Sequence, residues 1–185
     1  MDVIFVESFL AYEEAQAFFT AFEVLPWSRG KFMGAPVPRE EIWIGPYAYR
    51  FSGRTLEPAS WTPAIETIRE KIEKEYGGEY NSVLLNRYAN ARDSVSWHSD
   101  DEPEMDSNHP IASVSLGASR AFLVRPIADN KSNKTAVRTY TLHPGSLLVM
   151  PPGFQQKYWH CVPKSQAACG PRINLTFRRM KPKKS

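Results

Sequence analysis

Cysteine is scarce in this 185-residue sequence, which holds only Cys161 and Cys169. Two cysteines do not build the disulfide framework of a small secreted fold. We therefore expect both thiols to be reduced and the protein to be intracellular, cytoplasmic in a prokaryote and nuclear in a eukaryote.

Long apolar runs are also missing. No stretch of about 18 consecutive apolar residues occurs, so the sequence predicts no membrane-spanning helix and no membrane partner. The segment Met1–Glu7 has neither the basic region nor the long apolar core of a signal peptide, so we expect no secretory leader.

A large excess of charge of one sign is absent as well, because the net charge is only +3. Basic residues nevertheless gather in the segment Arg125–Arg138, which contains Lys131 and Lys134, and in the C-terminal segment Arg178–Lys184. Such clusters favour a polyanionic partner. A solvated hairpin tip and a solvated tail explain each cluster equally well, so charge alone leaves nucleic-acid binding open.

The length and a hydrophobic content of 42% predict one domain over residues 1–180, with a basic tail at residues 181–185. We expect this domain to be a monomer. Apolar residues recur at helical spacing in residues 12–24, and Thr62–Pro63 begins a second helix that ends at Gly77–Gly78.

Strands dominate the rest of the chain. Residues 42–51 alternate and are rich in aromatic side chains, which indicates strands or an ordered loop. The later strand patterns lie at residues 83–88, 111–116, 120–124, 136–142, 147–150 and 171–179. Two helices in the N-terminal half, packed on mostly antiparallel strands, indicate an α+β, mainly β fold of the jelly-roll type.

A His-x-Asp pair, His98 and Asp100, is the first candidate for chemistry. On an extended strand these two side chains point to the same face. A third ligand from His160 would complete two histidines and one carboxylate on one side of a metal, the arrangement of non-heme Fe(II) oxygenases. Taken alone, a His-x-Asp pair is more often a hydrogen-bonded surface pair than a metal site.

The C-terminal strand supplies a second candidate. In Arg172–Arg178 the apolar side chains alternate strictly with polar ones, so the polar set shares one face. A half-exposed strand explains this pattern, but two arginines around an Asn and a Thr also form a suitable cradle for a dicarboxylate. Asn86 and Tyr88 share a face of their own strand and would complete that cradle.

In this order and spacing, Asn86–Tyr88, His98–Asp100, His160 and Arg172–Arg178 resemble the AlkB-type Fe(II)/2-oxoglutarate-dependent dioxygenases over roughly residues 30–180. Residues 50–53, 97–103 and 111–117 resemble the nuclear DNA-repair paralogues of that family. The resemblance implies a double-stranded β-helix with a metal near its mouth, and oxidative dealkylation of nucleic-acid bases.

The resemblance also assigns roles residue by residue. It gives the iron ligands as His98, Asp100 and His160. It gives the side chains that hold 2-oxoglutarate as Asn86, Tyr88, Arg172, Asn174, Thr176 and Arg178. On the substrate side it gives Tyr49 and Phe51 as base-contacting aromatics and Asp101 as an acid. The apolar segment Phe32–Gly34 lies near the family's duplex-probing finger, although its alignment needs a gap.

The implied reaction uses Fe(II), O2 and 2-oxoglutarate to demethylate 1-methyladenine and 3-methylcytosine in DNA, with release of formaldehyde, succinate and CO2. These bases are cations, and Asp101 or Glu102 beside the metal would favour a cation over a neutral base. The alternative for either acid is that it only orients a neighbouring side chain. Of the two, Asp101 is the expected substrate contact.

Other functions remain open at the level of sequence. The same chemistry would serve an oxygenase that acts on RNA or on a protein side chain, and the sequence separates these poorly from a DNA enzyme. A non-catalytic nucleic-acid-binding jelly roll is the alternative of another class. The complete set of three ligands speaks against it, because a pure binding module needs no open metal coordination.

Overall fold

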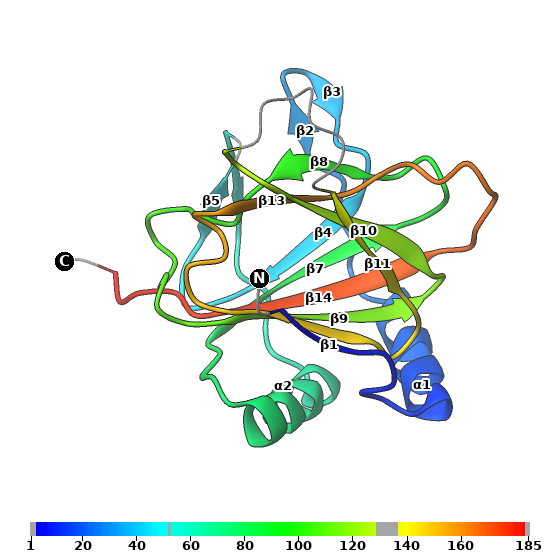
Figure 1. The fold of residues 1–185 in the computed structure, drawn as a ribbon, viewed down its shortest axis with the longest axis horizontal. Coiled ribbons are helices and arrows are strands. Elements are labelled where there is room, and N and C mark those ends of the chain that lie inside the picture. Colours follow the sequence, from blue (N-terminus) through cyan, green and yellow to red (C-terminus); the bar gives the residue numbers. More distant parts are fainter. Residues whose placement is uncertain (1–2, 52, 129–136, 184–185) are drawn as a thin grey trace.

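The structure, a computed structural model, describes residues 3–51, 53–128 and 137–183. Two helices cover one side of a large sheet, and a smaller sheet lies on its other side (Figure 1). The large sheet has the order β1 (Ile4–Val6), β12 (Leu147–Met150), β9 (Ile111–Gly117), β14 (Arg172–Arg178), β7 (Ser82–Tyr88), β4 (Glu40–Ile44). The smaller sheet has the order β11 (Arg138–Leu142), β10 (Arg120–Pro126), β13 (Tyr158–Val162), β8 (Val95–His98).

All pairings within these two sheets are antiparallel. Apolar side chains from both sheets, among them Ile111, Phe122 and Leu148, form one buried cluster between them. Two packed antiparallel sheets with helices on one outer face confirm the expected α+β, mainly β jelly roll.

Both predicted helices are present. Helix α2 (Pro63–Tyr76) begins at Thr62, whose Oγ1 accepts a hydrogen bond from the Ile65 backbone N–H at 3.4 Å, and ends at Gly77 with φ +73°. Its three isoleucines at helical spacing are fully buried. Helix α1 (Tyr12–Glu23) buries its own apolar stripe beside β9. Together the helices close the apolar face of the large sheet.

Strand β14 has two buried faces. Ile173, Leu175 and Phe177 pack in the cluster that contains the helices. The polar side chains between them point to the interior between the two sheets, and they are buried as well. The alternative interpretation of the alternation, a half-exposed strand, is therefore wrong. The second face is polar because it lines a cavity.

Two strand expectations need correction. Strand β8 ends at His98, so Asp100 lies in the following loop and not on the same strand face. Strand β13, which carries His160, was not predicted from the sequence, and it pairs with β8 so that His160 lies opposite His98. The two histidines therefore meet across neighbouring strands.

Two short hairpins lie at one end of the sheets, β2 (Lys31–Phe32) with β3 (Ala35–Pro36) and β5 (Tyr49–Phe51) with β6 (Arg54–Leu56) (Figure 1). At the tip of the first, Phe32 is 48% exposed and Met33 is 90% exposed. Met33 has φ +49°, in the left-handed region. This is the apolar tip that the sequence indicated.

Part of both basic segments lies outside the described residues, including Lys131, Lys134 and Lys184. Among the residues that are described, none of the helices has the length and apolar character needed to cross a bilayer.

Candidate metal and co-substrate site

A cavity of about 360 Å³ opens between the two sheets, beside the hairpins. It is lined by ten of the twelve side chains assigned from the sequence: Tyr49, Asn86, Tyr88, His98, Asp100, His160, Arg172, Asn174, Thr176 and Arg178. Residues from five strands and one loop thus converge on one space.

The three expected metal ligands form a compact group. Each of His98, Asp100 and His160 offers one ligand atom, and these atoms all lie within 4.8 Å of one another. The two imidazole rings are 4.3 Å apart between centroids. His98 Nε2 lies 3.6 Å from Asp100 Oδ1, which is too long for a hydrogen bond and leaves space for an ion between the two atoms.

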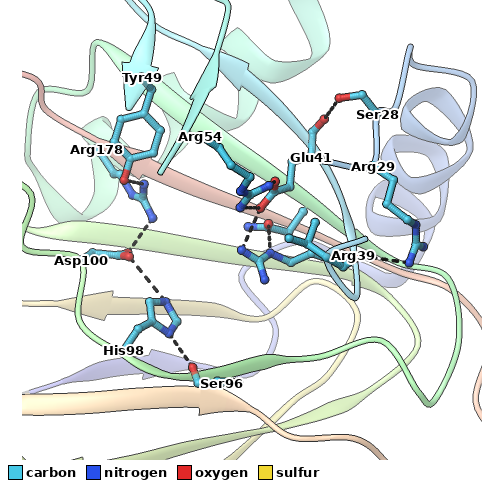
Figure 2. Close-up of polar contacts among 12 residues, drawn as sticks. Ser28, Arg29, Arg39, Glu41, Tyr49, Arg54, Ser96, His98, Asp100 and Arg178 are labelled. Atoms are coloured by element: carbon cyan, nitrogen blue, oxygen red, sulfur yellow. Dashed lines mark hydrogen bonds and ion pairs between the residues drawn. The ribbon is translucent and has the colours of Figure 1, made fainter. Parts of the chain in front are cut away.

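Hydrogen bonding sets the tautomer of His98. Its Nδ1 lies 2.8 Å from the Ser96 carbonyl oxygen (Figure 2). A carbonyl only accepts, so Nδ1 carries the proton and donates it. Nε2, on the side of Asp100, therefore presents a lone pair, as a metal-ligating histidine requires.

The charge states of the other two groups also suit a metal. Burial raises the pKa of Asp100, but Arg178 at 2.7 Å and the two histidines outweigh it and hold the pKa at about 2. Burial and the neighbouring His98 lower the pKa of His160 to about 3. Asp100 is thus ionised and His160 neutral at physiological pH, the forms that bind metals.

Arg178 and Arg172 have different surroundings. Arg178 is paired, since its Nη2 donates to Asp100 Oδ2 and its Nη1 donates to the Tyr49 hydroxyl at 3.1 Å (Figure 2). Arg172 is 1% exposed and donates from Nη2 to the side-chain oxygens of Ser115 and Asn174, both at 2.8 Å. Burial lowers the pKa of Arg172 to about 10.

Within the described part of the chain, no carboxylate pairs with Arg172, and its Nε and Nη1 have no hydrogen-bond partner. A buried cation without a counter-ion is costly. An anionic ligand in the cavity would supply the missing partner. The residues present therefore fit both a metal ion and a carboxylate co-substrate.

The remaining cradle residues are arranged beside Arg172. Asn174 accepts from Ser113 Oγ at 2.9 Å through Oδ1 and donates to Thr176 Oγ1 at 2.7 Å through Nδ2. The guanidinium of Arg172 also lies over the ring of Tyr88, 5.2 Å from its centroid. These contacts hold the polar face of β14 in place without a ligand.

The residues assigned to the substrate side are placed differently. Tyr49 lines the cavity and stacks on Trp43 at 4.5 Å between ring centroids. Phe51 ends β5, but its side chain lies outside the described part of the structure. Asp101 is exposed and lines a neighbouring hollow of about 170 Å³, whereas Glu102 lines both that hollow and the main cavity.

Sequence reasoning missed the charged network behind the cavity wall, in which one buried acid joins two arginines of the lining. Arg39 and Arg54 line the cavity, and the buried Glu41 bonds to both (Figure 2). One signal was available: Glu41 shares a strand face with Trp43, and apart from Glu40 the other residues of β4 are apolar. A charge at an inward position of such a strand needs a partner.

Comparison with known proteins identifies the family and supports the fold. The family model described as the 2OG-Fe(II) oxygenase superfamily matches residues 2–178. The chain therefore belongs to this superfamily.

Individual relatives place it among the AlkB-type members. It is 41% identical over 150 residues to alpha-ketoglutarate-dependent dioxygenase alkB homolog 3 of Homo sapiens, covering 78% of this chain and 52% of the relative. It is 39% identical over 155 residues to the DNA oxidative demethylase ALKBH2 of Mus musculus, covering 80% of this chain and 64% of the relative. The chain thus spans between half and two thirds of these two relatives.

The solved structure of OsALKBH1 superimposes with a TM-score of 0.61 at 17% identity, covering 96% of this chain and 97% of that chain. At this identity the likeness supports the fold alone.

Proposed function

We propose that the protein is an Fe(II)- and 2-oxoglutarate-dependent demethylase that repairs N-alkylated bases, 1-methyladenine and 3-methylcytosine, in DNA. One observation carries the proposal: a compact His98–Asp100–His160 group shares its cavity with a buried arginine, Arg172, that lacks a counter-ion among the described residues. A metal site and an anion site in one cavity suit this chemistry, and neither suits a pure binding module.

In this function His98, Asp100 and His160 would hold Fe(II). Two histidines and a carboxylate leave coordination positions open for other ligands. Arg178 would keep Asp100 in its ligating orientation, because its second donor is fixed on the Tyr49 hydroxyl. Ser96 would do the same for His98 through the Nδ1 proton.

The six cradle residues would hold 2-oxoglutarate. Arg172 would bind a carboxylate of this dianion through its unused Nε and Nη1 donors, which lie in a water-poor site where a charge-assisted hydrogen bond is strong. Asn86 and Tyr88, on the neighbouring strand β7 of the same sheet, would bind it from beside β14. When bound, Fe(II) with O2 and 2-oxoglutarate supplies the oxidation of an N-methyl group, with release of formaldehyde, succinate and CO2.

The substrate side of the cavity favours a flipped cationic base. A base inside a duplex cannot reach a metal placed between two sheets, so it must leave the stack. Glu102 lines the cavity, and burial raises the pKa of its carboxyl. The carboxyl is hydrogen-bonded to the Tyr49 side chain, while its Oε2 has no hydrogen-bond partner among the described residues. We now favour Glu102 over the exposed Asp101 as the acid that would accept from a methylated base.

DNA as the substrate is supported by the name of one relative, DNA oxidative demethylase ALKBH2. The exposed apolar tip at Phe32 and Met33 lies beside the cavity, and Phe32 is one of the residues that line the cavity. The tip would contact the base pair from which the damaged base is flipped. Aromatic and basic side chains at such a rim suit splayed bases and phosphates.

The test is an assay of oligonucleotides that carry 1-methyladenine or 3-methylcytosine, with Fe(II), ascorbate and 2-oxoglutarate. We expect formaldehyde and repaired base from the wild type and from His143→Ala, because His143 is exposed and outside the cavity. We expect neither product from His160→Ala. Finding no formaldehyde and no repaired base with the wild type on single-stranded DNA, duplex DNA or RNA refutes the proposal, and product from RNA alone moves the substrate to RNA.

A further inference from the structure

Glu41 is a buried acid with no place in the metal or co-substrate set. It is 1% exposed and sits on β4, the strand beside β7 in the large sheet. Its neighbour across the strands is Asn86, so both side chains lie on the face toward the cavity. Figure 2 shows two arginines converging on its carboxylate from different segments.

The first arginine connects Glu41 to the co-substrate cradle. Arg39 donates from Nη2 to Glu41 Oε1 at 2.8 Å and from Nε to Asn86 Oδ1 at 3.1 Å. A guanidinium has donors only, so the Asn86 amide must turn its oxygen toward Arg39. Its two N–H groups then remain for a partner other than Arg39, which would be an anion in the cavity.

The second arginine connects Glu41 to the substrate side. Arg54 belongs to β6, whose hairpin partner β5 carries Tyr49. Its guanidinium binds both carboxylate oxygens of Glu41. It passes close to Gly30, where a Cβ atom would lie 2.5 Å from Arg54 Nη1. The absent side chain at Gly30 thus gives Arg54 its path to Glu41.

We propose that Glu41 is a positioning residue that acts on both halves of the site. Through Arg39 it sets the Asn86 amide for 2-oxoglutarate, and through Arg54 it holds the β5–β6 hairpin at the substrate side. The inference rests on the proposed function. Beyond that function, we infer that Glu41, which belongs to neither the metal ligands nor the co-substrate cradle, governs both co-substrate affinity and substrate binding.

The first experiment measures 2-oxoglutarate binding by calorimetry, with Zn(II) in place of iron so that no turnover occurs. Glu41→Gln is expected to weaken this binding about tenfold, within the range found when a residue that orients a ligand is removed. The matched control is Glu40→Gln, because Glu40 is the next residue on β4 and pairs with Arg87 on the opposite face. The control is expected to bind like the wild type.

A double variant separates positioning from general loss of stability. If Glu41 acts through Asn86, then Glu41→Gln adds less than a twofold loss once Asn86→Ala is present. A full additional tenfold loss in that background overturns the proposal. Arg39→Lys serves as a second variant if Glu41→Gln does not fold, since lysine keeps the charge but loses the Nε contact.

Gly30→Ala tests the second part of the proposal, the role of Arg54 on the substrate side. The new methyl group displaces Arg54 and changes no charge, so the KM for methylated oligonucleotide is expected to rise severalfold while 2-oxoglutarate affinity changes less than twofold. An unchanged KM overturns this part. Failure of the proposed function looks different, because the wild type itself would then release no formaldehyde from methylated oligonucleotide, whereas the calorimetric comparison of Glu41→Gln with Glu40→Gln needs no turnover.

Discussion

The unpaired state of Arg172 makes a prediction about stability as well as binding. In protein without metal and co-substrate, Arg172→Met is expected to raise the free energy of unfolding. The pKa of Arg172 is lowered from 12.5 to about 10, which corresponds to about 3 kcal/mol of cost for the buried charge. Methionine of similar length carries no charge and fills the space.

Two losses oppose this gain. The variant gives up the hydrogen bonds from Arg172 to Ser115 and Asn174, each worth about 1 kcal/mol. The net expectation is therefore a stabilisation of about 1 kcal/mol, or roughly 2–4 °C in Tm for a chain of this size. Urea unfolding followed by circular dichroism measures it.

Arg178→Met is the matched control, because it removes the same group from the same strand face. Arg178 is paired with Asp100, and its loss leaves a buried carboxylate without that partner. This variant is expected to lose about 3–5 kcal/mol. The two arginines should therefore shift stability in opposite directions.

Co-substrate completes the test. With Zn(II) bound and 2-oxoglutarate at about 100 times its Kd, the wild type should gain about 2.7 kcal/mol of stability, and Arg172→Met should gain none. If Arg172→Met instead loses more than about 2 kcal/mol without ligand, Arg172 is a structural residue and the reasoning from its missing counter-ion is refuted.

Three further predictions concern single residues. His98→Ala should abolish turnover and leave the circular dichroism spectrum unchanged, and retained turnover would remove His98 from the metal site. Glu102→Gln should lower the preference for a cationic over a neutral methylated base by about tenfold, the value of one charge-assisted contact, whereas Asp101→Asn should not; equal effects in a competition assay would contradict the placement of these acids. Thr62→Ala should destabilise by about 1 kcal/mol through loss of the α2 N-cap, and an unchanged urea midpoint would exclude that role.

The sequence predicted the elements that carry a strong local signal. The cap at Thr62 and the glycines after Tyr76 gave both ends of α2, and the alternation in Arg172–Arg178 gave the two faces of β14. It did not predict β13, because Tyr158–Val162 has no strict alternation. Its strand nature comes from pairing with β8 and β10, which are distant in sequence.

For the site, the polar side chains of β14 and the two histidines could be chosen from their spacing and family pattern. The sequence could not show which of the two adjacent acids, Asp101 or Glu102, faces the cavity. Asp101 and Glu102 follow the end of β8, where the backbone has left the strand and period-two alternation no longer applies. In the structure Glu102 lines both the main cavity and the neighbouring hollow, whereas Asp101 lines the neighbouring hollow alone.

The two faces of β14 explain how the fold supports a site with unbalanced charge. On the helix side, Ile173, Leu175 and Phe177 are each fully buried, and each contributes about 1.5–3 kcal/mol. The three residues together contribute more than the cost of about 3 kcal/mol for the unpaired Arg172 on the other face. Because the apolar face stabilises the strand, the polar face need not satisfy every donor within the protein. Its unused donors are available to a ligand, and this division of roles lies within seven consecutive residues.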